Sequence, residues 1–352
     1  MCDSVRLSTR LVLAFFLFII QPASLDAQLP FYQGKTITLI VSSDAGGTSD
    51  LRVKSLIPFV QKYIPGNPTI VVEYMPGGGG RKAANHVYRS ARPDGLIIGS
   101  MGTTLLSAAI QGESGVLYDL RKFIYLGSSD ATTQHIFLTR KELGLTNLEK
   151  LRAASGIKIG AQSIGHNIYI TGRLFAFFLG LKDIRTVVGY SGPEIDLALL
   201  RGEVDARSSL VASVVQRTPE WIDKGLVDFH AVLETPKGNR HPRFAHLPEL
   251  ETFAKSDNER KVLALQRAIR LGGSAIVLPP DTPRERVEIL QEATRRALKD
   301  PAFPTSFRKL VGEDPTPLMP EELQKVIQEI PRDPEVIALF NKIAGAERLP
   351  DR

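Results

Sequence analysis

The chain has 352 residues, of which 43% are hydrophobic and 23% charged, a balance typical of a folded globular protein rather than a disordered one. Its 44 lysines and arginines exceed its 38 aspartates and glutamates, but they are scattered and few aromatic residues lie among them, which argues against a nucleic-acid-binding surface. A single cysteine excludes a disulfide framework.

The first residues predict an export signal. Arg6 and Arg10 precede an apolar run at 11–20, which suits a cleavable signal peptide and is shorter than the roughly 20 residues of a membrane-spanning helix. We therefore predict a signal peptide at 1–27, with an uncleaved membrane anchor as the alternative. Cleavage would also remove Cys2, the only cysteine, and the remaining chain is long enough for two domains.

From residue 36 onwards, short apolar strands alternate with helical patterns. Each strand ends in a turn, and the residues after it carry apolar side chains at helical spacing. This alternation predicts a mostly parallel, doubly wound α/β sheet. The predicted strands lie at 36–41, 69–73 and 96–100, and the predicted helices at 51–64 and 81–90.

The same alternation restarts further along the chain and predicts a second α/β unit. Its strands are expected at 157–160 and 185–188, and its helices at 167–179 and 193–201. The intervening segment 123–139 is irregular and suits a crossover between domains. In the last third of the chain we expect three helices, at 283–299, 321–329 and 334–344.

Two glycine-rich turns stand between a predicted strand and a predicted helix. They contain Gly46-Gly47-Thr48-Ser49 and Gly77-Gly78-Gly79-Gly80. Unpaired N–H groups at a helix start attract anions, and glycine lets a ligand approach the backbone closely. Because ligands bind at this edge of open α/β sheets, two such turns favour an anion site there. The alternative is that both are only tight turns and helix caps.

Catalytic motifs are weak in this sequence. Residues 78–83 fit a relaxed dinucleotide-binding pattern, but Asp94, the acid at about the right distance, lies in a turn. The segment 160–165 misses the nucleophile-elbow pattern by one position, and the histidines show no zinc-ligand spacing. An enzymatic alternative therefore depends on Ser163 and His166 alone, and we expect no cofactor and no metal.

Six segments, in order along the chain, resemble the tripartite tricarboxylate transporter receptors, also called Bug proteins. The opening segment 33–50 carries the first likeness, and 72–80 is similar to the family's V-E-N-x-P-G-A-G-G. Each match is weak by itself, but together they extend to residue 283. They are Q-G-K-T-I-T-L-I-V-S-S-D-A-G-G-T-S-D at 33–50, V-E-Y-M-P-G-G-G-G at 72–80, R-P-D-G at 92–95, G-Y-S-G at 189–192, G-E-V-D at 202–205 and P-D-T-P at 280–283.

The resemblance implies a type II periplasmic-binding-protein fold: two doubly wound α/β lobes, joined by crossover strands, with a ligand cleft between them. We expect lobe 1 to comprise 28–127 and 236–352, and lobe 2 to comprise 128–235. The implied function is a periplasmic receptor, without enzymatic activity, for a small carboxylate such as a di- or tricarboxylate, an aromatic acid or an amino acid. Its implied partners are the membrane permease subunits of a tripartite transporter.

In the family, loops of both lobes hold the ligand's carboxylate. Transferred to this chain, the resemblance implies contacts from the two glycine-rich turns, from the turn after the third strand and from the corresponding turns of lobe 2. The implied ligand-binding residues are Ala45, Gly46, Gly47, Thr48, Ser49, Gly79, Gly80, Thr103, Ser163, His166, Tyr190, Ser191 and Asp205.

Two further residues carry open alternatives. Arg207 stands where the family pattern has an apolar residue, so one hypothesis places it in the cleft, paired with a ligand carboxylate. The alternative is a surface arginine or a partner of Asp205. Asp50 either caps its helix or meets the amine of an amino-acid ligand.

Two other functions stay open from the sequence: an exported α/β hydrolase that uses Ser163 and His166, and a ligand sensor for a membrane kinase. We expect a monomer that binds no nucleic acid.

Overall fold

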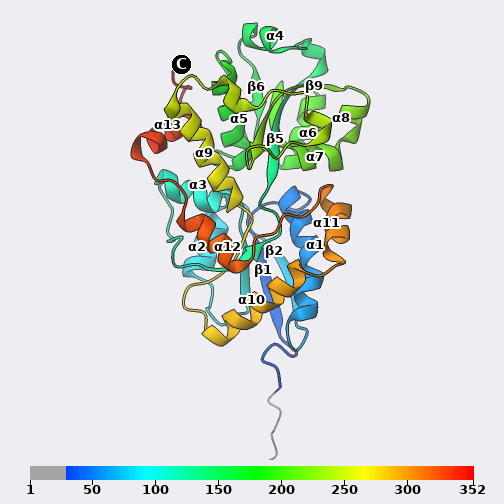
Figure 1. Cartoon of the computed structure of the whole chain (residues 1–352), viewed down its shortest axis with the longest axis vertical. Helices are drawn as coiled ribbons and strands as arrows, with labels where there is room; N and C mark the ends of the chain where they lie inside the picture. Colours follow the sequence, from blue (N-terminus) through cyan, green and yellow to red (C-terminus); the bar gives the residue numbers. More distant parts are fainter. Residues whose placement is uncertain (1–28) are drawn as a thin grey trace, which may run out of the picture.

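The computed structural model describes residues 29–352, so the predicted signal peptide and Cys2 lie outside the described residues. Residues 29–352 form two α/β lobes, each built on a five-stranded sheet, with lobe 1 below and lobe 2 above in Figure 1. The predicted fold class is confirmed.

The sheet of lobe 1 has the strand order β2-β1-β3-β10-β4. Its first three strands in the chain are parallel, whereas β10 comes from the last third of the chain and pairs antiparallel with both β3 and β4. The strands are β1 (Thr36–Val41), β2 (Thr69–Tyr74), β3 (Ile97–Ser100), β4 (Ile124–Ser128) and β10 (Ala275–Leu278), and the helices are α1 (Thr48–Tyr63), α2 (Arg81–Arg89), α3 (Thr104–Gln111), α10 (Arg284–Leu298), α11 (Phe303–Val311) and α12 (Pro320–Gln328).

The sheet of lobe 2 repeats this plan in the order β7-β6-β8-β5-β9, with β5 antiparallel to both of its neighbours. Its helix α5 is largely apolar, and each residue from Ile168 to Leu179 is buried, including Arg173. The strands are β5 (Thr133–Arg140), β6 (Lys158–Gly160), β7 (Arg185–Val187), β8 (Ala206–Leu210) and β9 (Val227–Thr235), and the helices are α4 (Leu148–Ala153), α5 (Asn167–Leu179), α6 (Gly192–Leu200), α7 (Val211–Arg217) and α8 (Pro219–Asp223).

Two segments connect the lobes. Residues 129–132 join β4 to β5, and the longer segment from β9 back to β10 contains α9 (Asp257–Leu271). The C-terminal helix α13 (Pro334–Ala344) packs against α9, α5 of lobe 2 and α3 of lobe 1, beside the junction of the lobes in Figure 1. Short 3₁₀ helices lie at Gly78–Gly80, Lys141–Leu143, Pro242–Phe244 and Leu250–Phe253.

The structure corrects three predictions. The segment 123–139 is not irregular: it holds β4 and most of β5, and β5 shows no polar–apolar alternation because residues 133–139 are all buried. The last third of the chain has α9 and α11 in addition to the three expected helices. We missed α9 because its inner face includes buried arginines, Arg267 and Arg270, in place of apolar residues.

The third correction concerns the boundary at 235/236. Phe244 belongs to the same apolar cluster as Trp221 of lobe 2, and the backbone of Glu249 forms an isolated β-bridge with Val232 of β9. The chain therefore stays on lobe 2 beyond residue 236 and returns to the sheet of lobe 1 only at β10.

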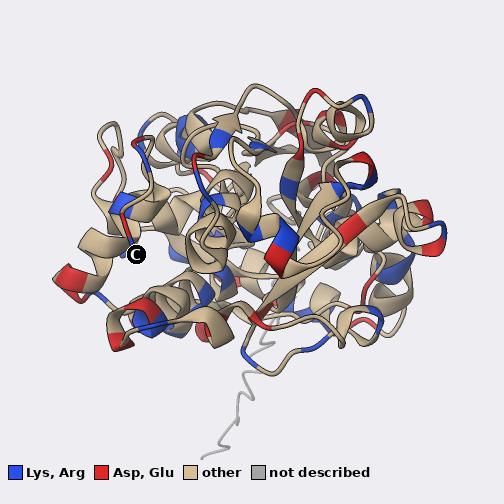
Figure 2. Ribbon diagram, turned by 90° about the horizontal axis from the view of Figure 1, so that it is seen from above, with Lys and Arg blue, Asp and Glu red and all other residues tan. Residues whose placement is uncertain are grey.

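Charged residues of both signs are mixed over the face shown in Figure 2, without a large area of one sign. Among residues 29–352, no helix is both long and apolar enough to cross a bilayer.

Candidate ligand-binding site

A cavity of about 120 Å³ lies between the two lobes. Lobe 1 contributes the ends of β1 and β3 and the starts of α1 and α3, and lobe 2 contributes the starts of α5 and α6 and the end of β8. The end of α9 and the loop after it close a further side. The cavity thus lies at the carboxyl ends of the parallel strands in both sheets, where open α/β sheets bind ligands.

Four helices of at least eight residues begin at this cavity: α1, α3, α5 and α6. Their N-cap residues Gly47, Thr103, His166 and Ser191 carry no negative charge. The first N–H groups of a helix have no partner within the helix, and the helix dipole adds partial positive charge at that end. Four helix starts around one small cavity therefore favour an anionic ligand.

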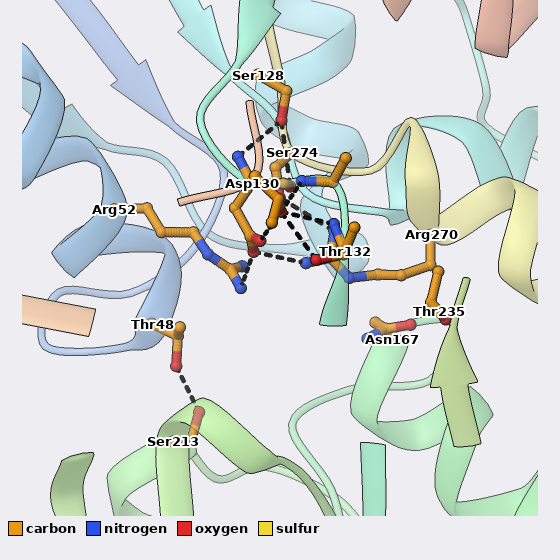
Figure 3. A network of polar contacts seen from close by, with 12 residues as sticks. Thr48, Arg52, Ser128, Asp130, Thr132, Asn167, Ser213, Thr235, Arg270 and Ser274 are labelled. Carbon is orange, nitrogen blue, oxygen red and sulfur yellow. Dashed lines mark hydrogen bonds and ion pairs between the residues drawn. The ribbon is translucent and has the colours of Figure 1, made fainter. Parts of the chain in front are cut away.

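Arg52 and Arg270 approach Asp130 from opposite sides (Figure 3). Arg52 comes from α1, Arg270 from α9, and Asp130 from the first connecting segment. Nη2 of Arg270 donates to Oδ2 of Asp130 at 3.0 Å, and Arg52 forms an ion pair with the same oxygen. Arg52 lines the cavity with only 8% of its surface exposed, and its Nε has no hydrogen-bond partner. We call Arg52, Asp130 and Arg270 the hinge triad.

A second arrangement of the same kind lies in lobe 2. Arg207 of β8 forms an ion pair with Oδ1 of Asp196 on α6. Arg217 of α7 donates to Oδ2 of the same carboxylate from Nε at 3.2 Å and from Nη2 at 3.0 Å. Arg207 and Arg217 both line the cavity. We call Arg207, Asp196 and Arg217 the lobe 2 triad.

Each triad sets two guanidinium groups against one carboxylate, which is an excess of one positive charge among its own three residues. Next to the hinge triad, burial and the charge of Asp130 raise the pKa of Glu313 to about 7, so this carboxyl is only partly ionised at neutral pH. Burial and the field of Arg52 lower the pKa of Arg270 to about 10, so the guanidinium of Arg270 stays protonated at neutral pH. Among residues 29–352, the only acid in the lining of the cavity is Asp44, which is exposed. The cavity is thus electropositive.

The lobes touch across the cavity. Oγ of Ser213 in lobe 2 lies 2.6 Å from Oγ1 of Thr48 in lobe 1 (Figure 3), and Nη1 of Arg217 donates to the same Thr48 oxygen at 3.3 Å. At the other end of the cavity, a Cβ atom on Gly79 would lie 3.3 Å from the backbone nitrogen of His166, so glycine permits this close approach. The structure therefore shows the lobes in contact around the cavity.

Most of the implied ligand-binding residues lie in the lining of the cavity. The two glycine-rich turns, the start of α3 and the starts of α5 and α6 are brought together from both lobes. The implied residues that line the cavity are Ala45, Gly47, Thr48, Ser49, Gly79, Thr103, His166, Ser191 and Arg207.

The other implied residues do not line it. Three of them belong to turns that border the cavity but do not line it themselves: Gly46, Gly80 and Ser163. The other three lie outside the lining: Asp50, Tyr190 and Asp205. The hydroxyl of Tyr190 donates to Glu203, and Asp205 accepts from Arg140 and from the backbone N–H of Lys158.

The structure resolves the alternatives for Asp50 and Arg207. Asp50 is fully buried and accepts hydrogen bonds from Lys54, Tyr74 and the N–H of Gly46. Burial opposes its ionisation, but these hydrogen bonds outweigh it and lower the pKa of Asp50. Asp50 therefore holds the first glycine-rich turn and does not face a ligand. Arg207 reaches the cavity, and its acidic partner is Asp196 rather than Asp205.

His166 has no acidic partner. Its Nδ1 accepts from the N–H of Ile168 at 3.2 Å as a helix cap, and burial lowers the pKa of the imidazole to about 4. Within residues 29–352, no carboxylate forms a hydrogen bond with this ring, and no cluster of three or more acids, histidines or cysteines is arranged to hold a metal. A triad of serine, histidine and acid around Ser163 therefore lacks its third member.

The polar lining residues that sequence reasoning missed include Arg52, Asn167, Ser213, Arg217 and Arg270. Arg52 could have been found, because it stands at the start of the helix predicted at 51–64, four residues after Thr48. The observed helix begins at Thr48, which places both residues on the same face. No comparable signal marks the other four.

Comparisons with known proteins agree with this geometry. No family model matches the chain. A protein from Agrobacterium vitis, described as "UPF0065 protein in the TAR-I ttuE-ttuC′ intergenic region", is 27% identical over 287 residues, which are 79% of this chain and 76% of the relative.

Similar solved structures cover most of both chains. The periplasmic binding protein BugD superposes with a TM-score of 0.67 at 23% identity, over 89% of this chain and 98% of BugD. MatC from Rhodopseudomonas palustris with bound malate gives 0.66 at 20% identity, over 88% of this chain and 99% of MatC. A protein of R. palustris with adipate gives 0.63 at 18% identity, over 88% and 96%.

These neighbours share the two-lobed architecture, and the order of sequence motifs along the chain points to the same group. The resemblance predicted from the sequence is therefore confirmed: the chain has the fold of the Bug-type periplasmic binding proteins.

Proposed function

We propose that this chain is an exported solute-binding receptor that captures a small dicarboxylate and delivers it to a tripartite tricarboxylate-type membrane transporter. The observation that carries the proposal is the cavity between the lobes, which is lined by two arginine–aspartate–arginine triads and four helix starts. The cavity has the polar groups to bind an anion. Among the described residues, His166 has no acidic partner that would orient it as a catalytic base, so the site offers less support for a hydrolase.

The charges of the cavity favour a ligand with two anionic groups. One net positive charge belongs to the hinge triad and one to the lobe 2 triad, so a carboxylate at each triad would neutralise both. An amino acid would bring an ammonium group, and Asp44 is the only acid in the lining to receive it. Among the ligand classes that the resemblance implies, a dicarboxylate thus fits the charge distribution better than an amino acid or a monocarboxylic aromatic acid. The neighbours with bound malate and with adipate carry ligands of this class.

Capture would use a hinge between the lobes. A dicarboxylate that contacts the hinge triad and the lobe 2 triad interacts with both lobes only when they are close, so it binds the closed form more tightly and shifts the population towards that form. The contacts of Thr48 with Ser213 and Arg217 across the cavity would then add to the stability of the closed form. A closed receptor presents a distinct shape to the permease subunits.

Several parts of the proposal rest on the sequence. The apolar run at 11–20 supports export, and the neighbour BugD is described as periplasmic. The likeness to Bug receptors supports delivery to permease subunits rather than signalling to a membrane kinase, and we propose that the receptor acts as a monomer.

The test is isothermal titration calorimetry of residues 28–352 with succinate, malate, benzoate and glutamate. We expect succinate or malate to bind, and Arg207→Gln to weaken that binding about 10- to 150-fold, the range for loss of a charge-assisted hydrogen bond. Arg201→Gln is the matched control, because Arg201 is exposed and lies outside the cavity. The proposal is wrong if no dicarboxylate binds, or if Arg207→Gln and Arg201→Gln bind it equally well.

A further inference from the structure

A second, smaller cavity lies between α1 and the sheet of lobe 1. Its volume is about 30 Å³, and four of the residues around it also line the cavity between the lobes: Val53, Leu56, Ser100 and Ile276. The small cavity therefore lies next to the ligand site, and these four residues border both.

The small cavity is apolar. Apart from Ser100 and Thr294, its walls are aliphatic side chains, among them Leu39 and Val60. Water needs two or more polar partners to occupy an enclosed space, so a cavity of this composition stays dry. An empty dry space lacks the dispersion contacts that a filled core has, and a methyl or ethyl group would restore them.

Helix α1 brings the polar site and the apolar cavity together. Thr48 and Arg52 face the cavity between the lobes, while Val53 and Leu56, on the next part of the same helix, border both spaces. A carboxylate held at Arg52 would thus have its neighbouring carbon atom beside apolar side chains rather than beside solvent or charge.

We propose that the small cavity is a subsite for an apolar branch of the ligand, so that the receptor prefers a dicarboxylate with a short alkyl substituent to an unbranched one. This inference rests on the proposed function, because it concerns the same binding site. It adds a determinant of specificity that lies inside lobe 1 and depends on packing, not on charge.

The test compares succinate, 2-methylsuccinate and 2-ethylsuccinate by calorimetry with residues 28–352. Burial of one methylene group tightens binding about fourfold. We therefore expect methylsuccinate to bind about four times, and ethylsuccinate about four to sixteen times, more tightly than succinate.

Variants of Val60 locate the effect, because Val60 lines the small cavity and not the ligand site. Val60→Leu fills the space, so it should abolish the gain from the branch and leave succinate affinity within twofold of the native value. Val60→Ala enlarges the space and should shift the preference towards ethylsuccinate. Circular dichroism confirms that each variant is folded.

The outcomes separate this inference from the proposed function. If succinate binds but neither branched acid binds more tightly, the subsite is refuted and the receptor stands. The subsite is also refuted if Val60→Leu keeps the full gain from the branch. If none of the three acids binds, the proposed function fails, and the subsite fails with it.

Discussion

Gly79 lies at a close contact between the lobes, and its replacement offers a direct test of closure. A Cβ atom at this position would lie 3.2 Å from Cγ2 of Thr104 in the same lobe, and 3.3 Å from both the carbonyl carbon of Gly165 and the nitrogen of His166 in lobe 2. Backbone atoms at the start of α5 cannot move aside as a flexible side chain would. Gly79→Ala should therefore disfavour the closed form and weaken ligand binding.

The expected size of the effect follows from two separable costs. Gly79 has a φ of +67°, so alanine there adds about 1–2 kcal/mol of backbone strain, which acts on the open and closed forms alike and cancels in the affinity. Crowding against lobe 2 acts only on the closed form. Overpacking of this kind costs about 1–3 kcal/mol, which corresponds to about 5- to 150-fold weaker binding.

Gly78→Ala is the matched control. Gly78 also has a positive φ, of +57°, but the atoms nearest to a Cβ there belong to the side chain of Arg81, at 3.5 Å or more, and not to lobe 2. Calorimetry with succinate or malate, and thermal unfolding of both variants, separate the two costs. Equal affinities of Gly79→Ala and Gly78→Ala would refute the role of Gly79 in closure, whereas equal losses of stability with unequal affinities would support it.

Three further outcomes are expected. In a double-mutant cycle of Thr48→Val and Ser213→Ala, each change should weaken ligand binding by about 0.5–1.5 kcal/mol, and the double variant should lose less than the sum; strict additivity would contradict the contact between them. Asp50→Asn should lower the free energy of unfolding by about 1–3 kcal/mol in a urea titration, because it weakens the hydrogen bonds that hold the first glycine-rich turn, and an unchanged free energy of unfolding would contradict that role. Burial and the charge of Asp130 raise the pKa of Glu313 to about 7, above its unfolded value of 4.5, so its contribution to stability is full below pH 4.5 and is lost as the pH rises through about 7. That loss amounts to at most about 3 kcal/mol, and Glu313→Gln should remove this part of the pH dependence of unfolding; an unchanged profile would contradict it.

The elements with regular patterns could be predicted from the sequence. The strand at 36–41 and the helices at 167–179 and 334–344 have the predicted bounds, because apolar periodicity and capping residues mark their ends locally. The strand β5 could not be recognised in the same way. It lies between β8 and β9, antiparallel to both, and is buried on both faces, so its sequence lacks the alternation of a half-buried strand.

The sequence indicated the loops around the cavity but not the charged residues that line it. Glycine-rich turns have a local signature, and Thr48, Gly79, His166 and Ser191, which the resemblance implied, line the cavity. The hinge triad has no such signature, because Arg52, Asp130 and Arg270 come from three distant segments and meet only in the folded chain.

The way in which β10 completes the sheet of lobe 1 has a consequence for the biosynthesis of the protein. The N-terminal strands β1 to β3 cannot reach β4 without β10, because β10 stands between β3 and β4 in the sheet. A nascent chain therefore carries an unfinished N-terminal half until more than three quarters of it has left the ribosome. If the segment at 1–27 directs export, this delay keeps the precursor incompletely folded, which is the state that a translocation channel accepts.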